Sequence, residues 1–244
     1  MLRIDDLDRP RVRPGAEDEI LRQLDAHGLG WDGPVRRQSE HAAEYEAALE
    51  RLQGCGCLYA CRCTRAQLSR TAPTPEPLED GEAPYPGTCR DAGWPDIDAA
   101  LRVRIGRGDV DGDFVVRRRD GQIGYQLACA IDEHILGITD VVRGADLTVS
   151  SRRQRWILER LGLPAPRYRH LPLILGADGR KLSKSTEAAP LRSDQAATNL
   201  DLALRLLGQE EREKGVESDP GAILRAAVKR WAPERISLEA VRIT

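Results

Sequence analysis

A short segment containing two lysines carries the strongest chemical signal in this sequence of 244 residues. The segment GRKLSKS, residues 179–185, follows an apolar stretch and holds Lys181, Ser183 and Lys184. Lys and Arg together number 37, and only four of these are Lys, so two lysines in one short segment stand out. A Lys ammonium is a mobile point charge, which can follow the negative charge of a polyphosphate during a reaction. The pattern therefore predicts a phosphate-binding loop, with a solvated surface loop as the alternative.

Three cysteines flank a segment that is rich in proline and acidic residues. Cys61 and Cys63 precede this segment, residues 71–88, and Cys89 closes it. A long segment of this composition would be loosely held unless something ties its ends together. Zinc prefers thiolate ligands in a tetrahedral arrangement, so one ion bound by the three cysteines would join the two ends. The alternative is a set of incidental thiols in a poorly ordered insertion.

The residues leave the fourth ligand of such an ion open. Cys55 and Cys57 form a second C-x-C pair, and Tyr85 precedes Cys89 in the same segment, so a thiolate or a phenolate could complete the set. The N-terminus lacks an apolar signal segment, so we expect a cytoplasmic protein, in which structural disulfides are rare. Cys129 lies in an apolar helical stretch and is expected to be a small core residue.

Carboxylates cluster after a short apolar stretch at the start of the chain. Asp5, Asp6 and Asp8 come directly after Leu2 and Ile4 in the stretch MLRIDDLDRP. Open α/β sheets place their ligand sites where strands end and enter loops. The stretch therefore predicts a strand end that contributes carboxylates to a ligand site.

The charge and hydropathy of the chain limit its partners. A formal net charge of −2 gives no overall attraction to nucleic acid, so any RNA contact must come from local patches. Arginines that could contact tRNA phosphates lie at Arg117–Arg119 and at Arg152, Arg153 and Arg155, with solvated surface positions as the equal alternative. The longest apolar runs are much shorter than a membrane span, so we expect no contact with a membrane.

The order of helical and extended patterns predicts an α/β protein. Apolar spacing, capping residues and terminating glycines predict helices at 16–28, 39–54, 124–137 and 150–161, and within 200–207 and 223–231. Ser39 is the predicted N-cap of the helix at 39–54, and Ser150 or Ser151 that of the helix at 150–161. Thr64 and Gln67 form a capping box, which predicts a further short helix. Strands are predicted at 101–105, 113–118, 138–142 and 171–175. This alternation of helices and strands favours a mostly parallel sheet.

Several of these motifs resemble one known family. KLSKS resembles the signature loop of class I aminoacyl-tRNA synthetases, and LRIDDLD and GITDVVRGADL resemble glutamyl-tRNA synthetases in particular. The closer resemblance is to the short glutamyl-Q tRNA(Asp) synthetases, carried by the C-x-C and Y-x-x-x-C spacing, GDFVVRR, YQLA and PRYRHLPLI. About 60 residues follow the signature loop, too few for the large anticodon-binding domain of a full glutamyl-tRNA synthetase.

The resemblance implies a fold and an order of parts. We expect a Rossmann-like class I synthetase catalytic core that is incomplete at its N-terminal side, with a zinc-tied insertion and a short helical C-terminal region. The expected parts are the first half of the core at 1–54, the insertion at 55–100, the second half of the core at 101–175, the signature loop at 176–190 and the helical region at 191–244.

The resemblance also implies a glutamate pocket. Asp5 takes the place of the acidic residue that holds the substrate ammonium, although the family usually has Glu there, so its reach is one methylene shorter. Tyr125 and Arg143 match the tyrosine and the arginine of the pocket, and Arg143 would pair with a substrate carboxylate through two parallel hydrogen bonds. From the residues alone, a packed ring and a surface ion pair are the simpler interpretations of Tyr125 and Arg143.

The remaining site residues follow from the same resemblance. Lys184 matches the ATP-binding lysine of the signature loop, with Lys181 and Ser183 beside it. The zinc ligands of the family fall on Cys61, Cys63, Tyr85 and Cys89, which makes Tyr85 the fourth ligand.

The implied reaction has two steps and uses ATP with Mg²⁺. Glutamate attacks the α-phosphorus of ATP to give glutamyl-adenylate, and the acyl group then passes to the queuosine base in the anticodon of tRNA(Asp). Such chemistry depends on positioning and on charge stabilisation more than on side-chain acids and bases. We expect a monomer whose partners are ATP, L-glutamate and the anticodon region of tRNA(Asp).

The family has an arginine-rich strand and a HIGH-type helix before the position of LRIDDLD, and no H-x-G-[HS] occurs in this sequence. Either the true start lies upstream of Met1, or the chain is a truncated paralogue that acts as a non-catalytic RNA-binding or metal-binding module. We therefore expect the 244-residue chain to be weakly active or inactive. A fragment of a glutamyl-tRNA synthetase or a small-molecule nucleotidyltransferase would also account for the lysine-containing loop.

Overall fold

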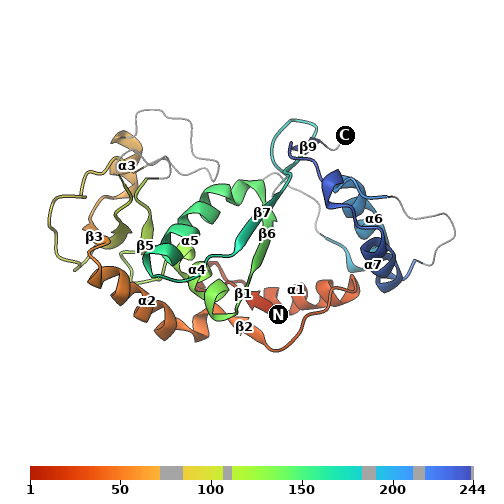
Figure 1. Ribbon diagram of the computed structural model, residues 1–244, viewed down its shortest axis with the longest axis horizontal. Coiled ribbons are helices and arrows are strands. Elements are labelled where there is room, and N and C mark those ends of the chain that lie inside the picture. The colour runs from red at the N-terminus through yellow and green to blue at the C-terminus, as the bar shows by residue number, and fades with distance from the viewer. Residues whose placement is uncertain (72–84, 107–111, 183–190, 211–217, 243–244) are drawn as a thin grey trace. The chain divides into compact units, whose positions relative to one another are not determined.

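The computed structural model divides the chain into two compact units (Figure 1). The residues described are 1–71, 85–106, 112–182, 191–210 and 218–242. Unit 1 comprises Met1–Ile4, Pro10–Arg36 and His170–Thr244, and unit 2 comprises Asp5–Arg9 and Arg37–Arg169. Among the described residues, no helix is long and apolar enough to cross a bilayer.

Unit 2 contains helices, short strands and a compact apolar core. Its helices are α2 (Ala42–Gly54), α3 (Arg65–Thr71), α4 (Tyr125–Ile135) and α5 (Thr148–Arg160). Its strands are β3 (Leu58–Cys61), β4 (Ala100–Val103), β5 (Val115–Arg117) and β6 (Asp140–Gly144), and β7 (Arg167–Leu171) begins in it.

Helix α4 lies at the centre of the core of unit 2, packed against α5 and α2 (Figure 1). Leu127 and Ile131 of α4 recur at helical spacing and are buried together with Ile157 and Leu158 of α5. Two carboxylates, Asp132 and Glu133, are buried in the same helix and therefore require partners inside the protein. Apolar periodicity thus accounts for the buried apolar face of α4, and the two buried carboxylates form polar contacts with other elements.

Strands β3, β4 and β5 form an antiparallel sheet with β4 in the middle. Leu58 pairs with Val103 and Cys61 with Ala100, so Cys61 lies at the end of the β3–β4 ladder. The prediction of a mostly parallel sheet is wrong here, because both strand pairs are antiparallel. For β4 and β5 the connecting chain is also too short for the crossover that parallel neighbours need. The α/β class itself is confirmed.

Unit 1 contains the remaining elements. They are β1 (Leu2–Ile4), α1 (Ala16–Ala26), β2 (Val35–Arg37, whose last residue belongs to unit 2), the end of β7, β8 (Ile174–Leu175), α6 (Ala196–Leu206), α7 (Pro220–Lys229) and β9 (Val241–Arg242). Strands β8 and β9 pair in parallel. His27 at the end of α1 is buried, and its Nε2 atom lies 2.9 Å from Nδ2 of Asn199 on α6. This contact joins the N-terminal and C-terminal parts of unit 1.

Local sequence signals located most helices but misplaced two N-caps. The capping box is confirmed, since the Thr64 N–H donates to Oε1 of Gln67 at 2.8 Å and the Gln67 N–H donates to Oγ1 of Thr64 at 3.2 Å. Ser39 is not an N-cap, because α2 begins after His41 and the Ser39 hydroxyl donates to Asp6 at 2.5 Å. The Ser39 hydroxyl thus bonds to the Asp6 carboxylate, which is distant in sequence, and not to the N-terminus of α2.

Helix α5 and two strands also begin or end at residues other than those predicted. Helix α5 starts at Thr148, so Ser150 and Ser151 lie inside it, and the Ser151 hydroxyl donates to the Leu147 carbonyl at 3.0 Å. The strand predicted at 138–142 is displaced to β6. The strand predicted at 171–175 is divided between β7 and β8, with Pro172, which lacks a backbone N–H, between them.

The packing of α4 gives a stability prediction with a control on the same helix. Ile131 is 4% exposed in the core, whereas Ile135 is 46% exposed. We expect Ile131→Ala to lower the free energy of unfolding by about 2–5 kcal/mol, because it leaves a cavity. Ile135→Ala should change it by less than about 0.5 kcal/mol. Urea denaturation followed by circular dichroism measures both, and equal effects would contradict this account of the core.

Candidate functional site

Three thiols of unit 2 meet in one cluster. Cys61 ends β3, Cys63 follows two residues later, and Cys89 reaches them from the far side of the segment that the cysteines flank. The three sulfur atoms lie within 4.8 Å of one another, and those of Cys63 and Cys89 are 3.5 Å apart. A tetrahedral zinc ion with bonds of about 2.3 Å separates its sulfur ligands by about 3.8 Å. The donor set and its spacing therefore fit a metal ion.

The Tyr85 hydroxyl completes the cluster. Its oxygen lies 3.4 Å from the sulfur of Cys61 and 3.5 Å from that of Cys63, and it accepts a hydrogen bond from the Cys89 N–H at 2.9 Å. A phenolic oxygen at this position is a fourth donor atom beside the three sulfurs. The structure thus brings together all four residues to which the family resemblance assigned the metal.

Electrostatics in the metal-free cluster favour one thiolate. Burial acts to raise the pKa of the Cys89 thiol, but hydrogen bonds from the Arg62 backbone N–H, Tyr85 and the two other thiols outweigh it and lower this pKa to about 7. Burial raises the pKa of Cys63 and that of Tyr85. Because a metal ion displaces protons from its ligands, Cys89 is the ligand that needs the least help to ionise.

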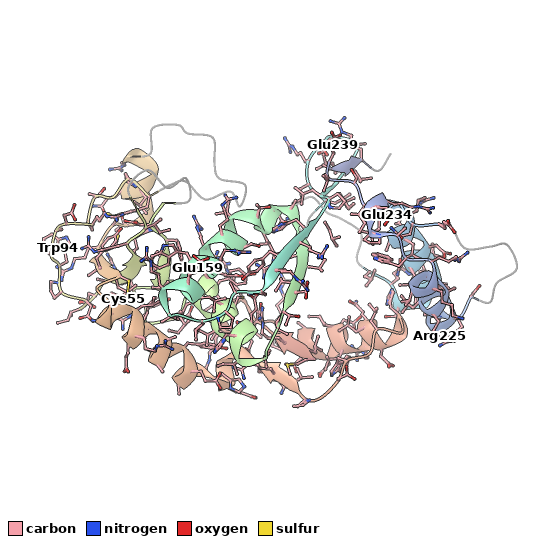
Figure 2. All side chains as sticks on the ribbon, viewed as in Figure 1. Cys55, Trp94, Glu159, Arg225, Glu234 and Glu239 are labelled. Carbon is pink, nitrogen blue, oxygen red and sulfur yellow. A yellow bond between two sulfur atoms is a disulfide. The ribbon has the colours of Figure 1, made fainter. Side chains whose placement is uncertain are left out.

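Cys55 and Cys57 are not part of this cluster. They form a disulfide across Gly56, at the end of α2, where Figure 2 labels Cys55. The positive φ of Gly56, 68°, gives the tight turn that brings the two Cα atoms to 5.4 Å. The expectation that the chain has no structural disulfide is therefore wrong, and neither sulfur is available as the fourth metal ligand.

A second group of predicted site residues meets elsewhere in unit 2. Tyr125 is the first residue of α4 and is 43% exposed. Burial raises the pKa of its hydroxyl, Cys129 and Asp5 add to this increase, and Arg143 on β6 opposes it. Such effects require proximity, so the structure brings Asp5, Tyr125 and Arg143 together around one hydroxyl.

Arg143 forms a buried ion pair, not the surface ion pair considered from the sequence. Its Nη2 donates to Oε1 of Glu133 at 2.7 Å, and the two side chains are 9% and 4% exposed. Its Nη1 donates to Oε1 of Gln154 at 2.8 Å. A guanidinium carries five N–H donors, so these bonds fix the group while leaving donors that could contact an anion.

Glu133, Gln154 and Tyr168 were not recognised from the sequence. The Tyr168 hydroxyl donates to the second carboxylate oxygen of Glu133 at 2.8 Å, and its ring lies under the Arg143 guanidinium, 5.1 Å from the centroid. The available signal was an ionisable residue inside the apolar helix that begins GYQLACAIDE, because a buried carboxylate needs a specific partner.

Asp5 lies beside helix α4. Its side chain is exposed, and its Oδ2 lies 3.9 Å from the sulfur of Cys129 on α4. Cys129 is fully buried, which confirms the prediction of a small core residue. The shorter carboxylate of Asp5 is therefore close to α4 at the position one turn after Tyr125.

The lysine-containing segment is described only in part. Gly176–Lys181 forms a tight turn, in which the Gly176 N–H donates to the Arg180 carbonyl at 2.9 Å, and Lys181 pairs with Leu175 in an antiparallel bridge. Lys181 is exposed and belongs to unit 1. Ser183 and Lys184 lie outside the described residues.

The arginines considered for RNA contacts differ in their availability. Arg152 and Arg155 are exposed on α5, but Arg153 is 3% exposed and lies over the Phe114 ring, 5.3 Å from its centroid. Both predicted roles of Arg153, a phosphate contact and a solvated charge, are therefore wrong. Arg117 lies 3.8 Å from Asp96, and Arg118 lies 2.7 Å from Asp120.

The chain matches the catalytic domain of the class I tRNA synthetases over most of its length. The family model described as "tRNA synthetases class I (E and Q), catalytic domain" matches residues 1–92 and 96–208. The glutamyl-Q tRNA(Asp) synthetase of Ectopseudomonas mendocina (strain ymp) is 46% identical over 253 aligned positions, which cover 97% of this chain and 83% of the relative. The corresponding protein of Pseudomonas aeruginosa PAO1 is 43% identical with the same coverage. The chain belongs to the glutamyl-Q tRNA(Asp) synthetase family.

Solved structures agree on the fold. A glutamate tRNA ligase from Elizabethkingia meningosepticum, solved with its amino acid, has a TM-score of 0.70 and is 22% identical. A glutamate-tRNA synthetase from Elizabethkingia anophelis has a TM-score of 0.73 and is also 22% identical. The match covers 100% of this chain, which spans 60% and 61% of those two chains.

The buried ion pair gives a prediction about stability. Glu133→Ala would leave the Arg143 guanidinium buried without its carboxylate, so we expect the free energy of unfolding to fall by about 3–5 kcal/mol. Asp140 lies on β6, the strand that carries Arg143, and pairs with the exposed Arg167, so Asp140→Ala should have little effect on the free energy of unfolding. Chemical denaturation compares the two variants, and a stable Glu133→Ala protein would contradict the importance of the pair.

Proposed function

We propose that this chain activates L-glutamate with ATP and transfers the glutamyl group to the queuosine base of tRNA(Asp). Identity of 46% to a glutamyl-Q tRNA(Asp) synthetase over 97% of the chain is the observation that carries this proposal. The meeting of Asp5, Tyr125 and Arg143 in one unit supports it, because an amino acid substrate needs both an anionic and a cationic partner.

In this proposal the pocket recognises glutamate by charge. The Asp5 carboxylate receives the substrate ammonium, and the remaining N–H donors of Arg143 receive a substrate carboxylate. Glu133 and Gln154 hold the guanidinium in one orientation, which reduces the entropy lost when the substrate binds. The Tyr125 hydroxyl, which is influenced by both charged groups, is proposed to contact the same substrate.

The first chemical step is the attack of a glutamate carboxylate on the α-phosphorus of ATP. The new C–O–P linkage forms while pyrophosphate leaves, so charge moves onto the phosphate oxygens. Lys181, Ser183 and Lys184 are proposed to stabilise this charge, with Lys184 binding ATP, and Mg²⁺ accompanies the nucleotide. In the second step a hydroxyl of the RNA base attacks the acyl carbon of the adenylate, an ester forms, and AMP leaves with the hydroxyl proton released to solvent.

The cysteine cluster is proposed to hold one structural zinc ion. Cys61, Cys63, Cys89 and Tyr85 would bind it, and a closed set of four protein ligands gives the ion a structural role. Its contribution is to tie the Cys61 and Cys89 sides of the insertion at 55–100 together. The other proposed parts are the two halves of the core at 1–54 and 101–175, the signature loop at 176–190 and the helical region at 191–244. We further propose a cytoplasmic monomer that contacts the anticodon region of tRNA(Asp).

Transfer to RNA tests the proposed reaction. With labelled glutamate and ATP, label should enter tRNA(Asp) that contains queuosine and not the same tRNA without it. Nuclease digestion should return the label on the modified nucleoside. This readout depends on where the label is found and not on how fast it is transferred. Label at the 3′ end of a glutamate tRNA would instead identify a glutamyl-tRNA synthetase activity.

Metal content tests the cluster. We expect about one zinc per chain, and Cys89→Ser should abolish stoichiometric binding. The double variant Cys55→Ser/Cys57→Ser makes the same change of sulfur to oxygen at both residues of the neighbouring disulfide and should keep the zinc. Elemental analysis of the purified proteins decides. Zinc retained by Cys89→Ser, or lost from the double variant, would show that the wrong ligands have been chosen.

A further inference from the structure

We propose that Arg102 is a positioning residue of the metal cluster, which holds the Tyr85 ring so that its oxygen faces the three sulfurs. The inference rests on the metal site proposed above and adds a residue that does not itself touch the metal. Arg102 lies on β4, the middle strand of the antiparallel sheet whose edge strand β3 ends at Cys61.

The Arg102 guanidinium lies directly on the Tyr85 ring. Its central carbon is 3.9 Å from the ring centroid, the shortest arginine–aromatic distance found among the described residues. Its Nη1 donates to the Asp113 carbonyl at 2.9 Å. Its Nε is buried and has no hydrogen-bond partner in the described part of the chain. The guanidinium is therefore held by its contact with the Tyr85 ring and by its hydrogen bond to the Asp113 carbonyl, although one buried donor stays unsatisfied.

Strand geometry explains why Arg102 reaches this ring. Leu101 and Val103, its neighbours on β4, point into the apolar core and are buried, so the side chain of Arg102 lies on the opposite face of the sheet. Tyr85 packs on Tyr59, Cys61 and Cys89 on that face. The ring is thus enclosed between the thiol cluster and the guanidinium, with its hydroxyl directed at the sulfurs.

Arg104 provides an internal comparison. It lies two residues further along the chain, and its guanidinium is 5.0 Å from the ring centroid of Tyr59. The Tyr59 hydroxyl donates to Oδ2 of Asp113 at 2.7 Å, so this tyrosine is committed to another partner. Both arginines lie over tyrosines beside the same cluster, but only the ring under Arg102 carries a candidate ligand.

The positive charge of Arg102 is expected to stabilise the zinc-bound cluster as well. The Tyr85 oxygen becomes negatively charged when it binds zinc, and a guanidinium lying on its ring offsets part of that charge. Groups that orient metal ligands without binding the ion typically change metal affinity by about 10–100-fold when they are replaced. Arg102 is therefore expected to act on metal affinity through Tyr85 alone.

The test compares Arg102→Gln, Arg102→Lys, Tyr85→Phe and the double variant Arg102→Gln/Tyr85→Phe, with Arg104→Gln as the matched control. Zinc affinity is measured by competition with a chromophoric chelator. The visible absorption of the cobalt-loaded proteins reports whether the phenolate is a ligand, because band positions depend on the donor set. Circular dichroism shows which variants are folded.

We expect Arg102→Gln and Tyr85→Phe each to weaken zinc binding by about 10-fold or more and to alter the cobalt bands in the same way. The double variant should bind no more weakly than Tyr85→Phe, and Arg104→Gln should match the unmodified chain. Arg102→Lys keeps the charge but loses the planar contact, so it should lose part of the affinity. If Arg102→Gln does not fold, Arg102→Lys decides by the same criteria.

Unchanged affinity and bands in the folded Arg102 variant would overturn the inference. An equal loss in Arg104→Gln, or losses from Arg102 and Tyr85 that add in the double variant, would overturn it as well. These outcomes leave the metal site itself intact, provided that the unmodified chain binds zinc. An unmodified chain that binds no zinc would overturn the metal site and the role of Arg102 together.

Discussion

The ion pair between Arg143 and Glu133 is the interaction on which the rest of unit 2 depends. It joins β6 to α4, and the additional bonds of Gln154 and Tyr168 extend it to α5 and β7. Two opposite charges buried this deeply are tolerated only when each is hydrogen-bonded by further groups, and both are. The pair therefore fixes four elements relative to one another and holds the guanidinium in one orientation. A pocket that distinguishes substrates by charge requires this kind of rigidity.

The cysteine cluster concerns the stability of the insertion, and its ligands, like the charges of the ion pair, are held by further contacts. The strands of the insertion are short, and its core is small, so a metal ion would supply stability that apolar burial does not provide. Cys61 is placed by the end of an antiparallel ladder, Cys89 by a turn, and Tyr85 by the arginine on its ring. Each ligand comes from backbone that is fixed by another interaction. The sheet thus helps to position the ligands, and a metal ion bound by them would hold Cys61 and Cys63 close to Cys89.

Sequence reasoning succeeded where the determining interactions are local. The amphipathic stripe of α4 and the capping box of Thr64 and Gln67 depend on residues within one or two turns, and both were predicted. It failed where a distant group competed for the same atoms. The Ser39 hydroxyl bonds to Asp6 and not to its own helix, and Arg153 lies over Phe114 although it is flanked by exposed arginines. Apolar periodicity carries no information about such partners.

The sequence by itself determined the family and the positions of most helices, because motifs and periodic patterns are properties of neighbouring residues. It also supplied the candidate site residues as predictions. Only the tertiary structure decided that Cys55 and Cys57 bond to each other, that the Tyr85 hydroxyl lies at the three remaining thiols, and that Arg143 is held by Glu133. Cys55 and Cys57 are only two residues apart, but Glu133 is 10 residues from Arg143 and Tyr85 is 24 residues from Cys61. Their geometry depends on how the elements pack, and packing is a property of the whole fold.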